Sequence, residues 1–218
     1  IRDRGLCGGL NTNLYKAVRA EVEGEDVTFV TVGRKLRQQV AKSGAELLAD
    51  FEVHDPVPFR EAKPIAKFLT EKFLSGDYDV IKVAFSNFVT TLTQTPHISQ
   101  LLPIEEEKLA EKRDYEGGGK EEDTGVDKAA ALAKDYVFEP SAAGVLEALL
   151  PLYINYQVYQ MLLESRASEH SARMVAMKAA TDNAESMIKD LTLEYNKVRQ
   201  AAITSELLEI TTAMKAME

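Results

Sequence analysis

The positions of glycine and proline constrain this chain more than any other feature. All 12 Gly and all 7 Pro lie at or before Pro151, and these two residue types end helices and form turns. The 67 residues from Leu152 to Glu218 therefore contain no strong helix breaker, and they are rich in Ala, Leu, Met, Glu and Lys, which favour the α-helix. At about 1.5 Å of rise per residue, the segment predicts a helix of roughly 100 Å.

Apolar residues recur along this predicted helix with the spacing of a coiled coil. A helix much longer than the average of about 11–12 residues needs lateral packing to persist. Steps of three and four residues define a seam made of Met177, Ala180, Ala184, Met187, Leu191, Tyr195, Val198 and Ala202. A neighbouring stripe consists of Ile203, Leu207, Ile210, Met214 and Met217. Two successive steps of four, at Leu191 and Tyr195, predict a locally unwound supercoil.

The first part of the chain alternates between strand-like and helix-like segments. Val27–Val32 is β-branched and ends at a glycine, and Val80–Phe85 is a second apolar strand candidate. Lys35–Ser43 and Phe59–Leu74 have the pattern of amphipathic helices. This alternation predicts an α/β domain with a mainly parallel sheet, although it leaves the strand order open.

Residues 104–134 interrupt this alternation with two acidic clusters around the triplet Gly117–Gly119. Low hydrophobicity and high charge cannot offset the entropy of ordering, so we expect a mobile insert. Structure is expected to resume at Tyr136–Glu139. Ser141 then has the character of a helix N-cap, and Pro151 marks an expected kink.

Composition excludes several classes of function. The net charge of -9 and the pI near 5.0 disfavour a nucleic-acid binder, because phosphate affinity requires clustered Lys and Arg. A single cysteine, Cys7, permits neither an internal disulfide nor a multi-thiolate metal site. His54, His97 and His170 lack any local metal-ligand spacing, so no metal is expected. No apolar stretch approaches the roughly 18 residues of a membrane span.

The segment Gly5–Asn11 resembles a loop that could hold a phosphate before a helix beginning near Leu10. It lacks both the G-x-G-x-x-G spacing and the Gly-Lys-Ser/Thr ending of a P-loop. We therefore interpret Gly5, Gly8 and Gly9 as a structural turn in which glycine supplies positive φ and close approach. A nucleotide-binding loop is the alternative.

Four segments together resemble the gamma subunit of rotary ATP synthase. They are DRGLCGGLN at residues 3–11, PHISQLLP at 96–103, ASEHSARMVAMKAATDNA at 167–184 and YNKVRQAAITSEL at 195–207. Outside the acidic insert, the resemblance extends over nearly the whole chain. It implies a central shaft that turns inside a ring of alpha and beta subunits and couples proton flow through the membrane ring to ATP synthesis or hydrolysis.

The resemblance also implies which residues meet partners. Gamma-type subunits carry no catalytic residue and no cofactor. Residues at positions that meet the catalytic ring are Arg173, Gln200, Thr204 and Glu206. Residues at the foot, near the epsilon subunit and the membrane c-ring, are Tyr136, Phe138 and Glu139. A guanidinium such as that of Arg173 can bridge carboxylates on an acidic partner.

The expected architecture is thus a Rossmann-like α/β domain over residues 1–139 and a shaft helix over residues 140–218, which forms half of an antiparallel coiled coil. Gamma-type chains begin with a long helix and a strand that this sequence lacks, and the cysteine pair of the redox-switchable chloroplast form is missing too. The expected location is the cytoplasmic face of a bacterial inner membrane, as a peripheral subunit. From the residues alone, a nucleotide-binding enzyme and a generic coiled-coil scaffold remain alternatives.

Overall fold

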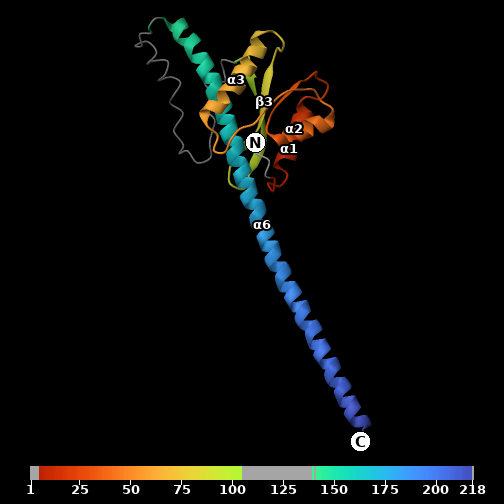
Figure 1. Cartoon of the computed structure of the whole chain (residues 1–218). Helices are drawn as coiled ribbons and strands as arrows, with labels where there is room; N and C mark the ends of the chain where they lie inside the picture. The colour runs from red at the N-terminus through yellow and green to blue at the C-terminus, as the bar shows by residue number, and fades with distance from the viewer. Residues whose placement is uncertain (1–4, 105–138, 140, 218) are drawn as a thin grey trace. The chain divides into compact units, whose positions relative to one another are not determined.

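The computed structural model describes residues 5–104, 139 and 141–217. The chain forms two compact units, Ile1–Arg173 and Met174–Glu218 (Figure 1). The strands and the shorter helices belong to the first unit. The predicted domain boundary at residues 139 and 140 stays a prediction.

Three helices precede the long one. They are α1 (Leu10–Glu21), α2 (Arg34–Ser43) and α3 (Phe59–Leu74). Helix α2 ends at Gly44, whose left-handed conformation with φ of 71° caps the helix at little steric cost. The helices predicted at Lys35–Ser43 and Phe59–Leu74 are confirmed to within one residue.

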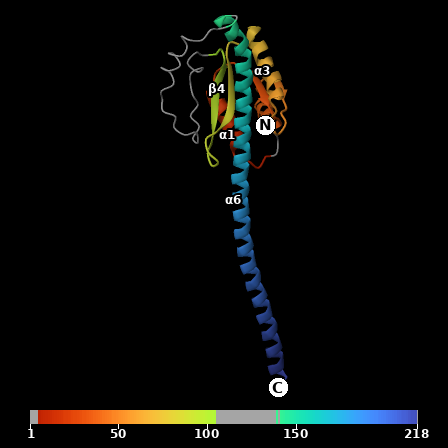
Figure 2. The ribbon, with the colours of Figure 1, turned by 90° about the vertical axis from the view of Figure 1, so that its left-hand side faces the viewer.

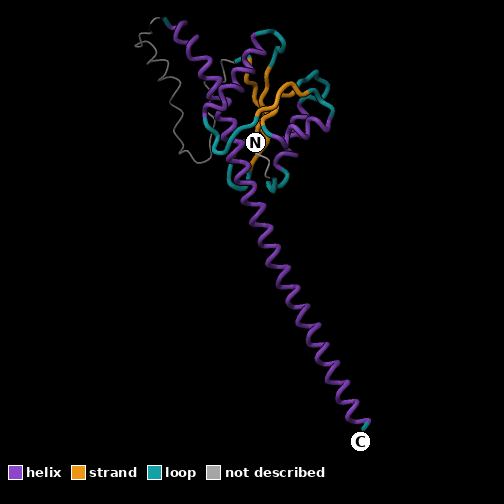
Figure 3. Tube along the Cα trace, viewed as in Figure 1, coloured by secondary structure: helices purple, strands orange, loops and turns teal. Residues whose placement is uncertain are grey.

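Two separate strand pairs complete the α/β unit. Strand β1 (Phe29–Val32) pairs in parallel with β2 (Leu47–Phe51), and β3 (Ile81–Phe88) pairs antiparallel with β4 (Gln94–Leu102) (Figure 3). The parallel pair, the alternating helices and the long C-terminal helix confirm the predicted α/β class. The antiparallel pair adds a hairpin that the alternation of the sequence did not reveal.

Strands β2 and β4 were missed because neither has an uninterrupted apolar sequence. Strand β2 contains Asp50, whose carboxylate accepts hydrogen bonds from Thr31 Oγ1 (2.7 Å) and Arg37 Nη1 (2.9 Å). Strand β4 begins with polar residues and contains Pro96, a residue that weakens a strand prediction. In both strands, pairing with another strand outweighs the low strand preference of the local sequence.

The core of the first unit lies between α3, the end of β4 and the first part of helix α6 (Ala142–Ala216). Figure 2 shows this part of α6 running between α3 and the β3–β4 hairpin. The buried cluster consists of Val53, Val57, Ala62, Ile65, Ala66, Leu101, Leu102, Ile154 and Val158. Apolar burial therefore fixes the first part of α6 against the sheet and α3.

Helix α6 begins as the sequence predicts. The backbone N–H of Gly144 donates to Ser141 Oγ at 3.1 Å, which confirms Ser141 as the N-cap. The helix continues through Pro151, where we expected a kink. None of the described helices is long and apolar enough to cross a membrane.

The second unit is the continuation of α6 from Met174. Every residue from Met177 to Met217 is solvent-exposed in this unit, including the whole predicted seam and its neighbouring stripe. The long helix is confirmed, whereas its pairing with an antiparallel helix stays a prediction. Residues 105–134 of the predicted mobile insert lie outside the described residues.

The packing of α3 predicts a strong contrast within that helix. Ile65 is 4% exposed and Leu74 is 77% exposed. Ile65→Ala should lower the free energy of unfolding by about 2–5 kcal/mol, because it removes buried methyl groups and leaves a cavity. Leu74→Ala should stay within about 0.5 kcal/mol of the parent. Urea unfolding of both variants measures the difference, and equal losses would contradict this core.

Candidate functional site

A run of buried polar side chains on α6 distinguishes the first unit. Ser165, Arg166, Ser168, Glu169 and Ser171 are each at most 8% exposed. Buried polar groups are costly unless they are hydrogen-bonded. Their partners therefore show how the helix is fixed to the rest of the unit.

The carboxylate of Glu169 is the centre of this cluster. Arg166 Nη1 donates to Glu169 Oε2 at 2.9 Å, and Arg173 Nη2 makes a short contact with Glu169 Oε1. Both guanidiniums lie on the same helical face as Glu169, because residues three and four apart are neighbours on a helix. One buried acid thus holds two cations.

Arg173 connects this cluster to the N-terminal turn. Its Nε donates to the backbone oxygen of Gly5 at 3.3 Å. Gly5 and Gly8 have φ of 62° and 60°, the left-handed conformation for which we expected glycine. A Cβ on Gly9 would lie 3.3 Å from the side chain of Asn13. The turn is thus held by backbone geometry and by Arg173, and whether it binds phosphate stays untested.

Asp55 connects the same cluster to the segment between β2 and α3. Its Oδ1 lies 3.9 Å from Arg166 Nε, and its Oδ2 lies 3.4 Å from His170 Nε2. Arg166 Nη2 is buried without a hydrogen-bond partner among the residues that the structure describes. His170 therefore lies beside the Glu169 cluster, in contact with Asp55.

Two serines attach α6 to the β3–β4 hairpin. Ser168, which is fully buried, donates to the backbone oxygen of Ser86 at 2.9 Å. Ser171 donates to the backbone oxygen of Thr91, also at 2.9 Å. The last turns of α6 in this unit are therefore bonded to three segments that are distant in sequence.

The other two histidines lie apart from this cluster. His54 Nδ1 lies 2.7 Å from Glu61 Oε1, and the His54 backbone N–H donates to Glu61 Oε2 at 2.7 Å. That backbone hydrogen bond is the main cause that lowers the pKa of the Glu61 carboxyl. His97 makes an edge contact with the ring of Phe85. Within the described ranges, no group of His, Cys, Asp and Glu could hold a metal ion.

The remaining predicted contact residues are dispersed. Gln200, Thr204 and Glu206 are exposed in the second unit, where Thr204 Oγ1 donates to the backbone oxygen of Gln200 at 2.8 Å. Glu139 is exposed in the first unit. Tyr136 and Phe138 lie outside the described residues. Their roles as partner contacts stay predictions.

Sequence reasoning missed the central role of Glu169. Glu169 and Arg173 are four residues apart in the sequence, a spacing at which oppositely charged pairs usually support a solvated helix. Only the fold shows that Glu169 is 2% exposed and that Arg166 joins it. A run of small and charged residues between apolar ones, from Ser165 to Ser171, was the available signal.

Comparisons with known proteins identify the family. The family model described as ATP synthase matches residues 2–217. The ATP synthase gamma chain of Akkermansia muciniphila is 50% identical over 99% of this chain and 72% of its own length. The gamma chain of Opitutus terrae is 45% identical over 98% of this chain and 71% of its own length. This chain belongs to the ATP synthase gamma family.

Solved structures agree with the fold of a gamma chain. The mitochondrial ATP synthase of Euglena gracilis, in a structure of OSCP, F1 and the c-ring, contains a chain that matches with a TM-score of 0.67. The match covers 100% of this chain and 70% of that chain at 24% identity. A second Euglena structure, of the rotor, matches with a TM-score of 0.62 at 24% identity, over 93% of this chain and 72% of that one. At this identity the likeness concerns the fold alone.

In this gamma-family chain, the Glu169 cluster predicts a large effect of a small substitution. Glu169→Gln keeps the shape but leaves Arg166 and Arg173 without their shared anion, which should cost about 3–5 kcal/mol of unfolding free energy. Glu185→Gln on the exposed part of the helix should change it by less than about 0.5 kcal/mol. Urea unfolding tests both. Equal unfolding free energies of the two variants would mean that the Glu169 cluster contributes little to stability.

Proposed function

We propose that this chain is the central-stalk rotor subunit of a proton-translocating ATP synthase. In this role it couples proton passage through a membrane c-ring to ATP synthesis or hydrolysis in a ring of alpha and beta subunits. The observation that carries the proposal is the 50% identity to an ATP synthase gamma chain over 99% of this chain. The likeness in fold to chains of rotor and F1/c-ring assemblies supports it.

The solvated helix of the second unit supports a role that depends on partners. Burying one large apolar side chain contributes roughly 1.5–3 kcal/mol, so seven such residues left in water forgo on the order of 10 kcal/mol. These seven are Met177, Met187, Leu191, Tyr195, Ile203, Leu207 and Ile210. A helix of this kind is expected to gain its stability from surrounding protein, as a shaft inside a ring would.

The predicted ring contacts do not share one face of the helix. Gln200 and Thr204 are four residues apart and lie on the same side, whereas Thr204 and Glu206 differ by about 200° around the axis. Such an arrangement suits a helix surrounded by several subunits better than one bound to a single flat surface. We propose that Arg173 meets the ring with the part of its guanidinium left outside its bonds to Glu169 and Gly5.

The proposal assigns no catalysis to this chain. Nucleotide chemistry would take place in the alpha and beta ring, and the chain would transmit torque. The foot residues Tyr136, Phe138 and Glu139 would meet the epsilon subunit and the c-ring. The assembly would place the chain on the cytoplasmic face of a bacterial membrane.

Assembly with ring subunits tests the function directly. The chain should co-purify with the alpha and beta subunits of Akkermansia muciniphila, whose gamma chain is 50% identical. The chain alone should hydrolyse no ATP. Co-purification only with further copies of itself would favour the coiled-coil scaffold. Saturable ATP binding by the chain alone, abolished by Gly8→Val, would favour the nucleotide-binding enzyme.

Thr204 allows a matched test of the ring contacts. Thr204 and Thr192 are both exposed and both donate to the carbonyl four residues earlier, at 2.8 Å and 2.7 Å. Val in place of either threonine should therefore change helix stability equally. We expect Thr204→Val to weaken binding to the alpha and beta ring by about tenfold, which is 1.4 kcal/mol, as loss of a hydrogen bond would. Thr192→Val should leave binding unchanged. Equal binding of both variants to the ring would show that the Thr204 hydroxyl makes no contact there.

A further inference from the structure

The guanidinium of Arg173 divides its donors between two acceptors. Its Nη2 contacts Glu169 Oε1, and its Nε donates to the backbone oxygen of Gly5 at 3.3 Å. The Nε–H and an Nη–H of a guanidinium form a fork that matches both oxygens of one carboxylate. Glu169 lies within reach of this fork, because residues four apart are neighbours on a helix. The division of the fork therefore depends on what occupies the second oxygen of Glu169.

Arg166 occupies that second oxygen. Its Nη1 donates to Glu169 Oε2 at 2.9 Å. The side chains of Arg166 and Glu169 are 8% and 3% exposed, so water competes little for this bond. A charge-assisted hydrogen bond in such surroundings is stronger than one at the surface. The bond to Arg166 thus holds the carboxylate in the orientation in which Oε1 is the oxygen that contacts Arg173.

The bonding of Arg166 is incomplete for a buried cation. Its Nε lies 3.9 Å from Asp55 Oδ1, beyond hydrogen-bond distance. Its Nη2 is buried without a partner in the described part of the chain. A buried donor without a partner costs free energy, and an apolar side chain in place of a buried charge is often neutral for stability. Stability alone therefore does not explain a cation at this position.

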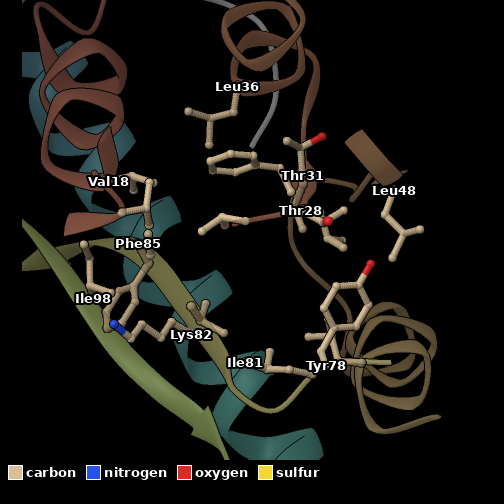
Figure 4. A pocket seen from close by; sticks show the side chains of 18 of the residues that line it. Val18, Thr28, Thr31, Leu36, Leu48, Tyr78, Ile81, Lys82, Phe85 and Ile98 are labelled. Carbon is tan, nitrogen blue, oxygen red and sulfur yellow. The ribbon is translucent and has the colours of Figure 1, made fainter. Parts of the chain in front are cut away.

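A cavity of about 670 Å³ lies beside the same segment of α6 (Figure 4). Met161 and Ser165 line it from this helix, together with residues of both strand pairs. Arg166 is not among the lining residues, and neither are Glu169 and Arg173. A small molecule in this cavity would not contact the Arg166 guanidinium, so the role of Arg166 follows from its protein neighbours.

The Gly5 carbonyl precedes an unusual backbone conformation. Leu6 has φ of 58°, in the left-handed region that bulky residues rarely adopt. Leu6 is also 68% exposed, so burial does not hold it there. The Gly5 carbonyl belongs to the peptide bond between Gly5 and Leu6, and the orientation of this peptide bond relative to Leu6 is what φ describes. A donor fixed on the Gly5 oxygen therefore supports the conformation of the turn.

We propose that Arg166 is the positioning residue for Arg173 and for the turn at Gly5. By holding Glu169 Oε2, Arg166 prevents a bidentate pair between Glu169 and Arg173 and keeps Arg173 Nε on the Gly5 carbonyl. A buried residue thereby determines which part of the Arg173 guanidinium is left for a partner. This last consequence rests on the proposed ring contact of Arg173, whereas the positioning itself concerns the chain alone.

The carbon signal of the Gly5 carbonyl tests the positioning in the full chain. Glycine labelled with ¹³C at the carbonyl and leucine labelled with ¹⁵N make only Gly–Leu peptide bonds visible by NMR, and the sequence contains two, Gly5–Leu6 and Gly9–Leu10. The Gly9 carbonyl accepts from the Asn13 amide at 2.8 Å, so it reports whether α1 is intact. Arg173→Gln removes the donor to Gly5 and supplies the reference shift.

Arg166→Met should move the Gly5 signal to its position in Arg173→Gln and leave the Gly9 signal unchanged. Arg166→Gln should do the same, because neither replacement carries a charge-assisted donor. The order parameter of the Leu6 amide should fall from about 0.85 to below about 0.6. Arg166→Lys keeps a cation beside Glu169 and should retain the parent signal. Arg199→Met, the same change at an exposed position, is the matched control and should have no effect.

Ring binding is measured separately as a double-mutant cycle. Arg166→Met should weaken binding to the alpha and beta subunits of Akkermansia muciniphila by about tenfold, the effect of one lost hydrogen bond. In the Arg173→Gln background it should have no further effect.

An unchanged Gly5 signal in Arg166→Met and Arg166→Gln would overturn the positioning role, and so would an unchanged signal in Arg173→Gln. Equal weakening of ring binding with and without Arg173 would show that Arg166 does not act through Arg173. If Arg173→Gln leaves ring binding unchanged while Arg166→Met moves the Gly5 signal, only the proposed ring contact fails.

Discussion

The ion-pair cluster around Glu169 is the interaction on which the arrangement of the first unit most depends. A buried carboxylate is tolerable only when cations and hydrogen bonds compensate it, and Arg166 and Arg173 supply both. Through Arg173 the cluster reaches the turn at Gly5, and through Arg166 it reaches Asp55. One helical segment thus fixes the positions of elements that are more than a hundred residues apart in sequence.

Helix α6 buries apolar side chains in the first unit and exposes them in the second. In the first unit, α6 buries Ile154 and Val158 against α3 and the end of β4. In the second, the same helix exposes apolar side chains such as Leu191 and Ile203 to solvent. Helix propensity alone is a weak source of stability over such a length. The second unit is therefore the part of the chain whose stability depends most on partners, which fits a rotor subunit.

The sequence predicted those parts of the fold that local patterns determine. The absence of Gly and Pro after Pro151 predicted the long helix, and Ser141 predicted its start. Strand β4 could not be predicted, because its residues become a strand only through antiparallel pairing with β3. The burial of Glu169 could not be predicted either, because the turn and the hairpin that cover this part of α6 are distant in sequence.

The same limit explains why the direction of β3 and β4 was not predicted. Alternation of helices and strands predicted a mainly parallel sheet, yet within the described residues only β1 and β2 are parallel. Strand β3 ends at Phe88 and β4 begins at Gln94. A connection this short cannot form a parallel crossover, which needs a dozen or more residues. The two strands therefore pair antiparallel, and the length of the connection, rather than the alternation of helices and strands, determines the direction of this pair.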